Sequence, residues 1–231
     1  MQAKDIKKQL RLLIEEASVI DPGLARKLED INRWVKDVKP GSLTAKKFVL
    51  FFLQQIIQDA IIWLDIQALE SPEEQQHYFE RMTPSEYYWY KYLFPKWLNQ
   101  PDPKFSIWKR KLMAGEFQQE DINILRAIAT DVVHREGTFW HCYIADFSMA
   151  TDIIISNREQ QPLCIQITSL SDEFSQEKSD NWENTLQQWG IDRGLFLSYN
   201  PHITDFVTQL VNISLYNSDR LKTGVYLKFS L

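Results

Sequence analysis

Polar residues placed within two apolar, strand-like runs are the part of this sequence best suited to chemistry. The stretch ATDIIISNREQQPLCIQITS covers residues 150–169, with Asp152 ahead of one run and Gln166 and Thr168 inside the next. Residues two apart on a strand share a face, and opposed side chains on paired strands lie about 5 Å apart. Carboxylate and amide oxygens suit hard divalent cations such as Mg²⁺. The spacing therefore predicts that Asp152 and Gln166 can meet across the ladder, with Thr168 on the same face of the strand.

A second interpretation of the same stretch is structural and involves no chemistry. Asp152 would then be a turn or capping residue, and Gln166 and Thr168 would form the polar face of a half-exposed strand. The buried alternates of that strand would be Leu163, Ile165 and Ile167.

The elements that must position these residues alternate between helix and strand periodicity in the second half of the chain. Helices are predicted at 119–136, 175–190 and 201–216, and strands at 137–147, 151–157, 162–169, 193–200 and 224–231. A three-stranded meander followed by right-handed crossovers would give a mixed sheet with helices on both faces.

This element order, with an acidic residue opening the middle strand of the meander, resembles the restriction-endonuclease-like fold of the PD-(D/E)xK nuclease superfamily. The resemblance covers about residues 118–231. Asp152 matches the aspartate of the family pattern, Gln166 falls at the glutamate and Thr168 falls at the lysine. Glu136, which closes the first helix of this half, is the candidate for the additional helix acid of the family.

The resemblance implies a nucleic-acid-acting protein that uses Mg²⁺ or Mn²⁺. Asp152, Gln166 and Glu136 are then the implied metal ligands. The implied catalytic set is Asp152, Gln166, Thr168 and Lys178, with Lys178 on the following helix as a substitute for the lysine missing at 168. Gln166 carries no charge and Thr168 is not cationic, so this set is altered.

Two functional hypotheses follow from the altered set. The first is an atypical or weakened metal-dependent nuclease that acts on DNA or RNA. The second is a catalytically inactive nuclease-fold module that binds a protein or nucleic-acid partner.

The first half of the chain has the periodicity of helices throughout. Apolar stripes predict helices at 6–20, 22–38 and roughly 43–69, and serine and threonine caps begin two more after Ser71 and Thr83. Asp21 is the expected N-cap of the second helix, with Pro22 at its first position. The expected fold class is therefore α+β, with a helical bundle at 1–117 and the restriction-endonuclease-like domain at 118–231.

Residues 85–111 form a second candidate site because they hold nine aromatic residues and six basic residues. Aromatic platforms and cations together grip single-stranded nucleic acids. The alternative is that Trp89, Tyr92 and Phe94 anchor this segment in the core. The candidate nucleic-acid-binding residues are Lys91, Lys96, Lys104, Lys109, Arg110, Lys111 and Trp108, together with Tyr87, Tyr88 and Tyr90.

Composition excludes several other classes of function. The net charge is −5 for the whole chain, +2 for residues 1–117 and −7 for 118–231, which disfavours bulk attraction to nucleic acid by the second half. The four histidines lack metal or nucleophile spacing, and the seven glycines form no phosphate-binding loop. Cys142 and Cys164 are expected to be buried, reduced thiols in a cytoplasmic protein. The apolar run at 48–64 contains Asp59 and three glutamines, so it predicts a buried helix and no membrane partner.

Overall fold

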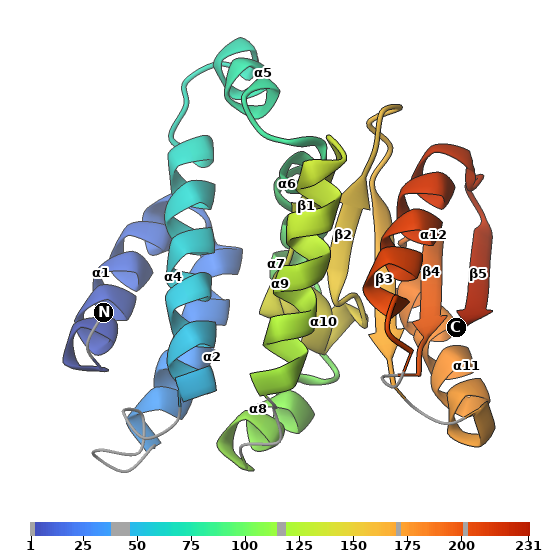
Figure 1. Ribbon diagram of the computed structural model, residues 1–231. Coiled ribbons are helices and arrows are strands. Elements are labelled where there is room, and N and C mark those ends of the chain that lie inside the picture. Colours follow the sequence, from blue (N-terminus) through green and yellow to red (C-terminus); the bar gives the residue numbers. More distant parts are fainter. Residues whose placement is uncertain (1–2, 38–46, 115–118, 170–171, 201–202) are drawn as a thin grey trace. The chain divides into compact units, whose positions relative to one another are not determined.

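The computed structural model describes residues 3–37, 47–114, 119–169, 172–200 and 203–231, which form two compact units (Figure 1). The helical unit contains residues 1–81 and 94–117, and the sheet unit contains residues 82–93 and 118–231. The sequence interpretation placed 82–93 in the helical domain, whereas the structure assigns this segment to the sheet unit.

The helical unit is built from amphipathic helices around an apolar interior. Helix α1 (Ala3–Ile20) packs against α2 (Pro22–Asp37) and α4 (Lys47–Gln67). The sequence predicted that the long apolar helix begins near residue 43, and residues 43–46 lie outside the described part of the chain. The helices are α1 (Ala3–Ile20), α2 (Pro22–Asp37), α4 (Lys47–Gln67), α5 (Pro72–Glu80), α7 (Phe94–Asn99) and α8 (Phe105–Ala114).

Side-chain caps fix where these helices begin, as the sequence predicted. Asp21 Oδ1 accepts from the backbone N–H groups of Gly23 and Leu24 at 2.8 and 3.1 Å at the start of α2. Ser71 and Glu74 form a capping box at the start of α5. Each cap satisfies backbone donors that have no partner within the helix.

One described helix, at Phe48–Gln67, is long and apolar enough to cross a membrane by length and composition alone. About half of it, 56%, is buried inside the protein, and Asp59 lies in its interior with 2% exposure. A core helix of a soluble protein has the same properties, so this helix is consistent with a soluble protein.

The sheet unit has one mixed five-stranded sheet in the order β1-β2-β3-β4-β5 (Figure 1). The pairs β1–β2 and β2–β3 are antiparallel, whereas β3–β4 and β4–β5 are parallel. The strands are β1 (Thr138–Trp140), β2 (Ile153–Ser156), β3 (Leu163–Thr168), β4 (Arg193–Ser198) and β5 (Val225–Ser230). The helical segments are α6 (Pro84–Tyr88), the π-helical turn η1 (Trp89–Leu93), α9 (Gln119–His134), α10 (Tyr143–Met149), α11 (Asp172–Gln188) and α12 (Phe206–Arg220).

The predicted strand at 137–147 is wrong over most of its length. It ends at Trp140, and residues Tyr143–Met149 form α10 instead. Tyr143 and Phe147 are four residues apart, which is a helical spacing, and their ring centroids lie 5.6 Å apart. Ala150 ends the helix in the left-handed region at φ 52°. The chain therefore makes a helical turn between β1 and β2 and not a tight hairpin.

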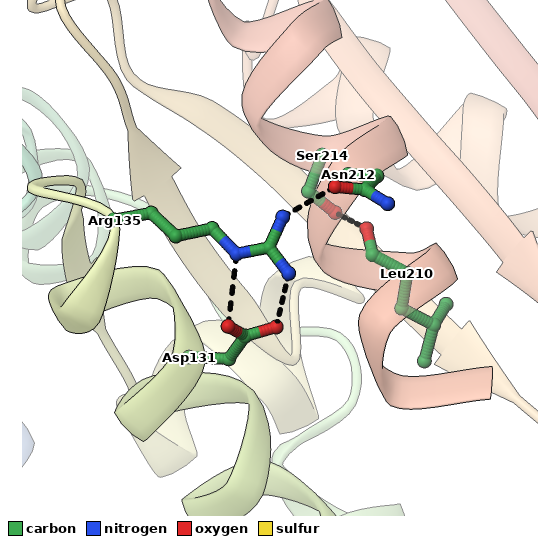
Figure 2. A network of polar contacts seen from close by, with 5 residues as sticks. All are labelled: Asp131, Arg135, Leu210, Asn212 and Ser214. Carbon is green, nitrogen blue, oxygen red and sulfur yellow. Dashed lines mark hydrogen bonds and ion pairs between the residues drawn. The ribbon is translucent and has the colours of Figure 1, made fainter. Parts of the chain in front are cut away.

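Alternate strand residues face two different helical layers. Ile153, Ile165 and Leu195 belong to the apolar core that α9 and α12 cover. On this side, the guanidinium of Arg135, in the turn directly after α9, pairs with Asp131 of α9 at 2.8 Å and also donates to Asn212 of α12 (Figure 2). These contacts connect the two helices that cover this face.

The opposite face of the sheet packs against α11. The Trp182 and Phe196 ring centroids lie 5.5 Å apart. A Cβ added to Gly194 would lie 2.4 Å from a methyl carbon of Leu186 and 2.8 Å from the Trp182 ring. Helix α11 therefore approaches β4 closely because residue 194 has no side chain.

Candidate functional site

The carboxylate of Asp152 joins the beginning of β2 to the end of β3. Its Oδ2 atom accepts hydrogen bonds from Gln166 Nε2 and from the backbone N–H of Ile167, each at 2.6 Å. The antiparallel register, with Ile153 opposite Ile165, places these atoms at the same edge of the sheet. The prediction that Asp152 and Gln166 meet across the ladder is therefore confirmed.

Lys178 reaches the same edge from α11. Its Nζ donates to Thr168 Oγ1 at 2.9 Å, and its charge stabilises the ionised form of Asp152. Thr168 of β3 thus receives a hydrogen bond from an ammonium group of the neighbouring helix. The structure brings together all four residues of the predicted catalytic set.

The polar residues of β3 are buried, and they do not form the half-exposed polar face of the structural interpretation. Gln166 is 8% exposed and Thr168 is 5% exposed. Leu163 and Ile165 are buried on the opposite face, as that interpretation expected. Buried amide and hydroxyl groups require partners, and here Asp152 and Lys178 provide them.

Asp146 of α10 is a further acidic residue at this site. Its side chain hydrogen-bonds with the carboxyl group of Asp152. Two carboxyl groups in contact need a shared proton or a cation between them, because two negative charges at that distance repel. The sequence prediction omitted Asp146 because it assigned residues 137–147 to a strand. The spacing of four residues between Tyr143 and Phe147 is a helical spacing, and this signal in the sequence could have placed Asp146 on a helix.

Burial controls the protonation of the central carboxyl group. It raises the pKa of Asp152 from 3.8 to about 6, against the opposing effects of the Ile167 N–H, the Lys178 charge and hydrogen bonds with Asp146 and Gln166. Asp152 is thus mainly ionised at pH 7, but it takes up a proton in mildly acidic solution.

The groups that flank the two acids are held in their neutral forms. Burial lowers the pKa of His141, whose Nδ1–H donates to the Asp152 backbone carbonyl at 2.9 Å. Burial and the nearby charge of Asp146 raise the pKa of Tyr143 to about 12, while Arg126 opposes this shift. The ammonium of Lys178 therefore provides the positive charge that acts on Asp152.

Glu136 does not belong to this cluster, so its predicted role as a metal ligand with Asp152 is wrong. Thr138 pairs with Ser156, at the end of β2 opposite Asp152. Ser156 lies four residues after Asp152, so the rise of a β-strand puts about 13 Å between their Cα atoms. Glu136 is exposed and has φ 64°, and it lies in the turn between α9 and β1, near the end of β2 that is remote from Asp152. Within the described ranges, no group of three His, Cys, Asp or Glu residues is placed to hold a metal ion.

The basic and aromatic residues of 85–111 are divided between the two units. Lys91 belongs to the sheet unit, whereas the other five predicted cations belong to the helical unit. Trp108 is 3% exposed and its ring contacts Trp34 and Phe52, so its predicted stacking on a nucleic-acid base is wrong. Tyr90 is also buried, against Trp140.

The anchoring interpretation of this segment is correct for Trp89 and Phe94, which are fully buried. Tyr92 is 46% exposed and contacts the rings of Tyr87 and Tyr88. The role of the lysines and of Arg110 in binding nucleic acid stays a prediction.

Cys142 and Cys164 are both buried, and neither forms a disulfide.

Comparison of the chain with family models, curated proteins and solved structures produced no match. Any functional conclusion must therefore come from the geometry of the cluster around Asp152.

Proposed function

We propose that the sheet unit is an atypical metal-dependent nuclease domain that resembles the PD-(D/E)xK superfamily. The observation that carries this proposal is the hydrogen bond from Lys178 Nζ to Thr168 Oγ1 beside the Asp152 carboxylate. Lys178 is half-buried, and its ammonium group is hydrogen-bonded to a hydroxyl group of β3 close to a buried carboxylate. The sheet order, with an antiparallel meander followed by two parallel strands, also supports the resemblance.

The residues present fit a divalent cation with oxygen ligands. Asp146 and Asp152 lie in hydrogen-bond contact, and a cation would replace the proton that their contact otherwise requires. These two carboxylates and the amide oxygen of Gln166 would hold Mg²⁺ or Mn²⁺. The bound ion would supply Lewis-acid stabilisation of a phosphodiester and a more acidic water.

The chain's own groups would perform the remaining tasks. The Lys178 ammonium would bind a phosphate oxygen and stabilise the negative charge that develops on it during cleavage. Thr168 fixes the position of that ammonium through its hydroxyl group. The Ile167 N–H orients the Asp152 carboxylate through its 2.6 Å hydrogen bond.

A second candidate function is a catalytically inactive module of the same fold that binds a partner. Its support is that Gln166 Nε2 donates to the same Asp152 oxygen as Ile167 N–H, so this oxygen is already satisfied within the protein. Residues 118–231 carry a net charge of −7, which favours a protein partner over DNA or RNA. A cytoplasmic location, inferred from the two reduced thiols, belongs to both proposals.

A cleavage assay separates the two functions. Full-length protein would be incubated with labelled single- and double-stranded DNA and RNA in Mg²⁺, Mn²⁺ or EDTA. We expect metal-dependent cleavage that is lost in Asp152→Asn and in Lys178→Met. Lys222→Met is the matched control, since Lys222 is an exposed lysine of the same unit. A folded protein that cuts none of these substrates would overturn the nuclease proposal and favour the binding module.

A further inference from the structure

A pocket in the helical unit lies between α2 and the turn that joins α7 to α8. It has a volume of about 420 Å³, within the range of small-molecule sites. Its charged lining residues are Arg26, Lys27, Asp30 and Asp102, and Phe105 contributes an aromatic ring. The balance between these charges determines which ligand the pocket accepts.

Both acids of the pocket already have partners in the protein. Asp102 Oδ2 accepts from the indole N–H groups of Trp97 and Trp108, each at 3.2 Å. Asp30 forms an ion pair with Arg33, one turn further along α2. Both carboxylates therefore have hydrogen-bond or ion-pair partners within the protein.

The two cations are less completely engaged. Lys27 Nζ donates to the backbone carbonyl of Gln100 at 2.7 Å and lies 4.8 Å from the centre of the Trp97 ring. An ammonium has three N–H donors, so this bond leaves others available. Across the described part of the chain, neither Lys27 nor Arg26 has an ion-pair partner within 4 Å. Burial lowers the pKa of Lys27, while the nearby charges of Asp102 and Asp30 raise it.

We propose that this pocket binds a small organic phosphate monoester. The guanidinium of Arg26 and the ammonium of Lys27 together offer donors for the phosphate oxygens, and a guanidinium matches two of them at once. The pocket is larger than a bare phosphate requires, and Phe105 and Leu98 provide apolar surface for the organic part of the ligand. This proposal is independent of the nuclease proposal, because it involves only residues of the helical unit.

Isothermal titration calorimetry on the full-length protein tests this proposal. The probes are adenosine 5′-monophosphate, ribose 5-phosphate, inorganic phosphate, adenosine and benzoate. We expect saturable binding of the monoesters, weaker binding of inorganic phosphate, and no binding of adenosine. Stronger binding of benzoate than of either monoester would overturn the phosphate assignment, as would an absence of binding by both monoesters at millimolar concentration.

Two variants and a control locate the binding. Arg26→Gln and Lys27→Met should each weaken monoester binding about tenfold or more, since each removes a charge-assisted hydrogen bond. Arg26 is exposed, so its replacement should leave the fold intact, and the methionine keeps an apolar chain over Trp97. Lys36→Gln, an equal charge change on an exposed residue of α2, should alter binding less than about twofold. Unchanged affinity in both pocket variants would show that the ligand binds elsewhere.

Discussion

Asp102 in the helical unit and Asp152 in the sheet unit are two carboxylates that have different neighbouring groups. The hydrogen bonds that the Asp102 carboxylate accepts come from neutral donors, two indole N–H groups and the backbone N–H of Lys104, although the charge of Lys27 lies nearby. Asp152 lies against a second carboxyl group, a lysine and a buried amide. The difference teaches that hydrogen bonds from neutral groups can hold a carboxylate in place, whereas full burial beside a second carboxyl group changes its pKa, as is common at functional sites.

The largest expected effect is on the rate of cleavage, which should depend on Asp152 and not on Asp102. Asp152→Asn should lower the proposed cleavage about a thousandfold or more, equivalent to about 4 kcal/mol, because it removes the charge of the proposed metal ligand. Initial cleavage rates in Mg²⁺ measure this effect. Asp102→Asn is the control, and an equal loss in both variants would remove the distinction drawn between the two sites.

Replacement of Asp102 should be the most destabilising of the single changes. Asp102→Ala leaves two buried indole N–H groups without acceptors, at a cost of about 2–4 kcal/mol in the free energy of unfolding. Urea unfolding monitored by tryptophan fluorescence gives this value. A loss below about 0.5 kcal/mol would mean that the indoles find water or other acceptors.

Asp152→Asn should have the opposite effect on stability. The native protein holds the Asp152 proton more tightly than the unfolded chain, because the pKa is about 6 in the fold and near 4 in the unfolded chain. The contribution of this group to stability is therefore present below pH 4 and is lost as the pH rises through about 6. At pH 7.5 the variant should therefore be more stable than the wild type by on the order of 1–3 kcal/mol.

Unfolding measurements at pH 4 and pH 7.5 in EDTA check this prediction. The advantage of the variant should shrink at pH 4, where the wild-type carboxyl group is protonated. A variant that is less stable than the wild type at both pH values would identify Asp152 as a structural residue.

The smallest expected effect concerns Glu136. Because this residue is exposed and lies at the far end of β2, Glu136→Gln should change cleavage less than about twofold and stability less than about 0.5 kcal/mol. The same cleavage and unfolding assays measure both quantities. A large loss of activity would place Glu136 near the substrate despite its distance from Asp152.

Strand periodicity was sufficient to predict the central contact of the candidate site. An alternation of two fixes Gln166 and Thr168 on one face of β3, and the polar turn between the strands brings Asp152 to that edge. Capping residues such as Asp21 and Ser71 act through local hydrogen bonds, so helix starts were also predictable.

Errors arose where tertiary packing decided the outcome. The aromatic residues from 139 to 147 suit either strand or helix, and contact between Tyr143 and Phe147 selects the helix that carries Asp146. The sequence does not distinguish a buried tryptophan from an exposed one that stacks on a base. Contacts with Trp34 and Phe52, which are distant in the sequence, identify Trp108 as buried. Glu136 was misplaced because its distance from Asp152 depends on strand register.

The missing side chain at Gly194 affects the helix that carries Lys178, because α11 packs directly over this position of β4. Lys178, Trp182 and Leu186 recur every four residues, so they lie along one side of α11. A methyl group at 194 would displace Trp182 and Leu186, and the backbone that carries Lys178 would tilt with them. The absence of a side chain at Gly194 therefore allows α11, the helix that carries Lys178, to lie close to β4.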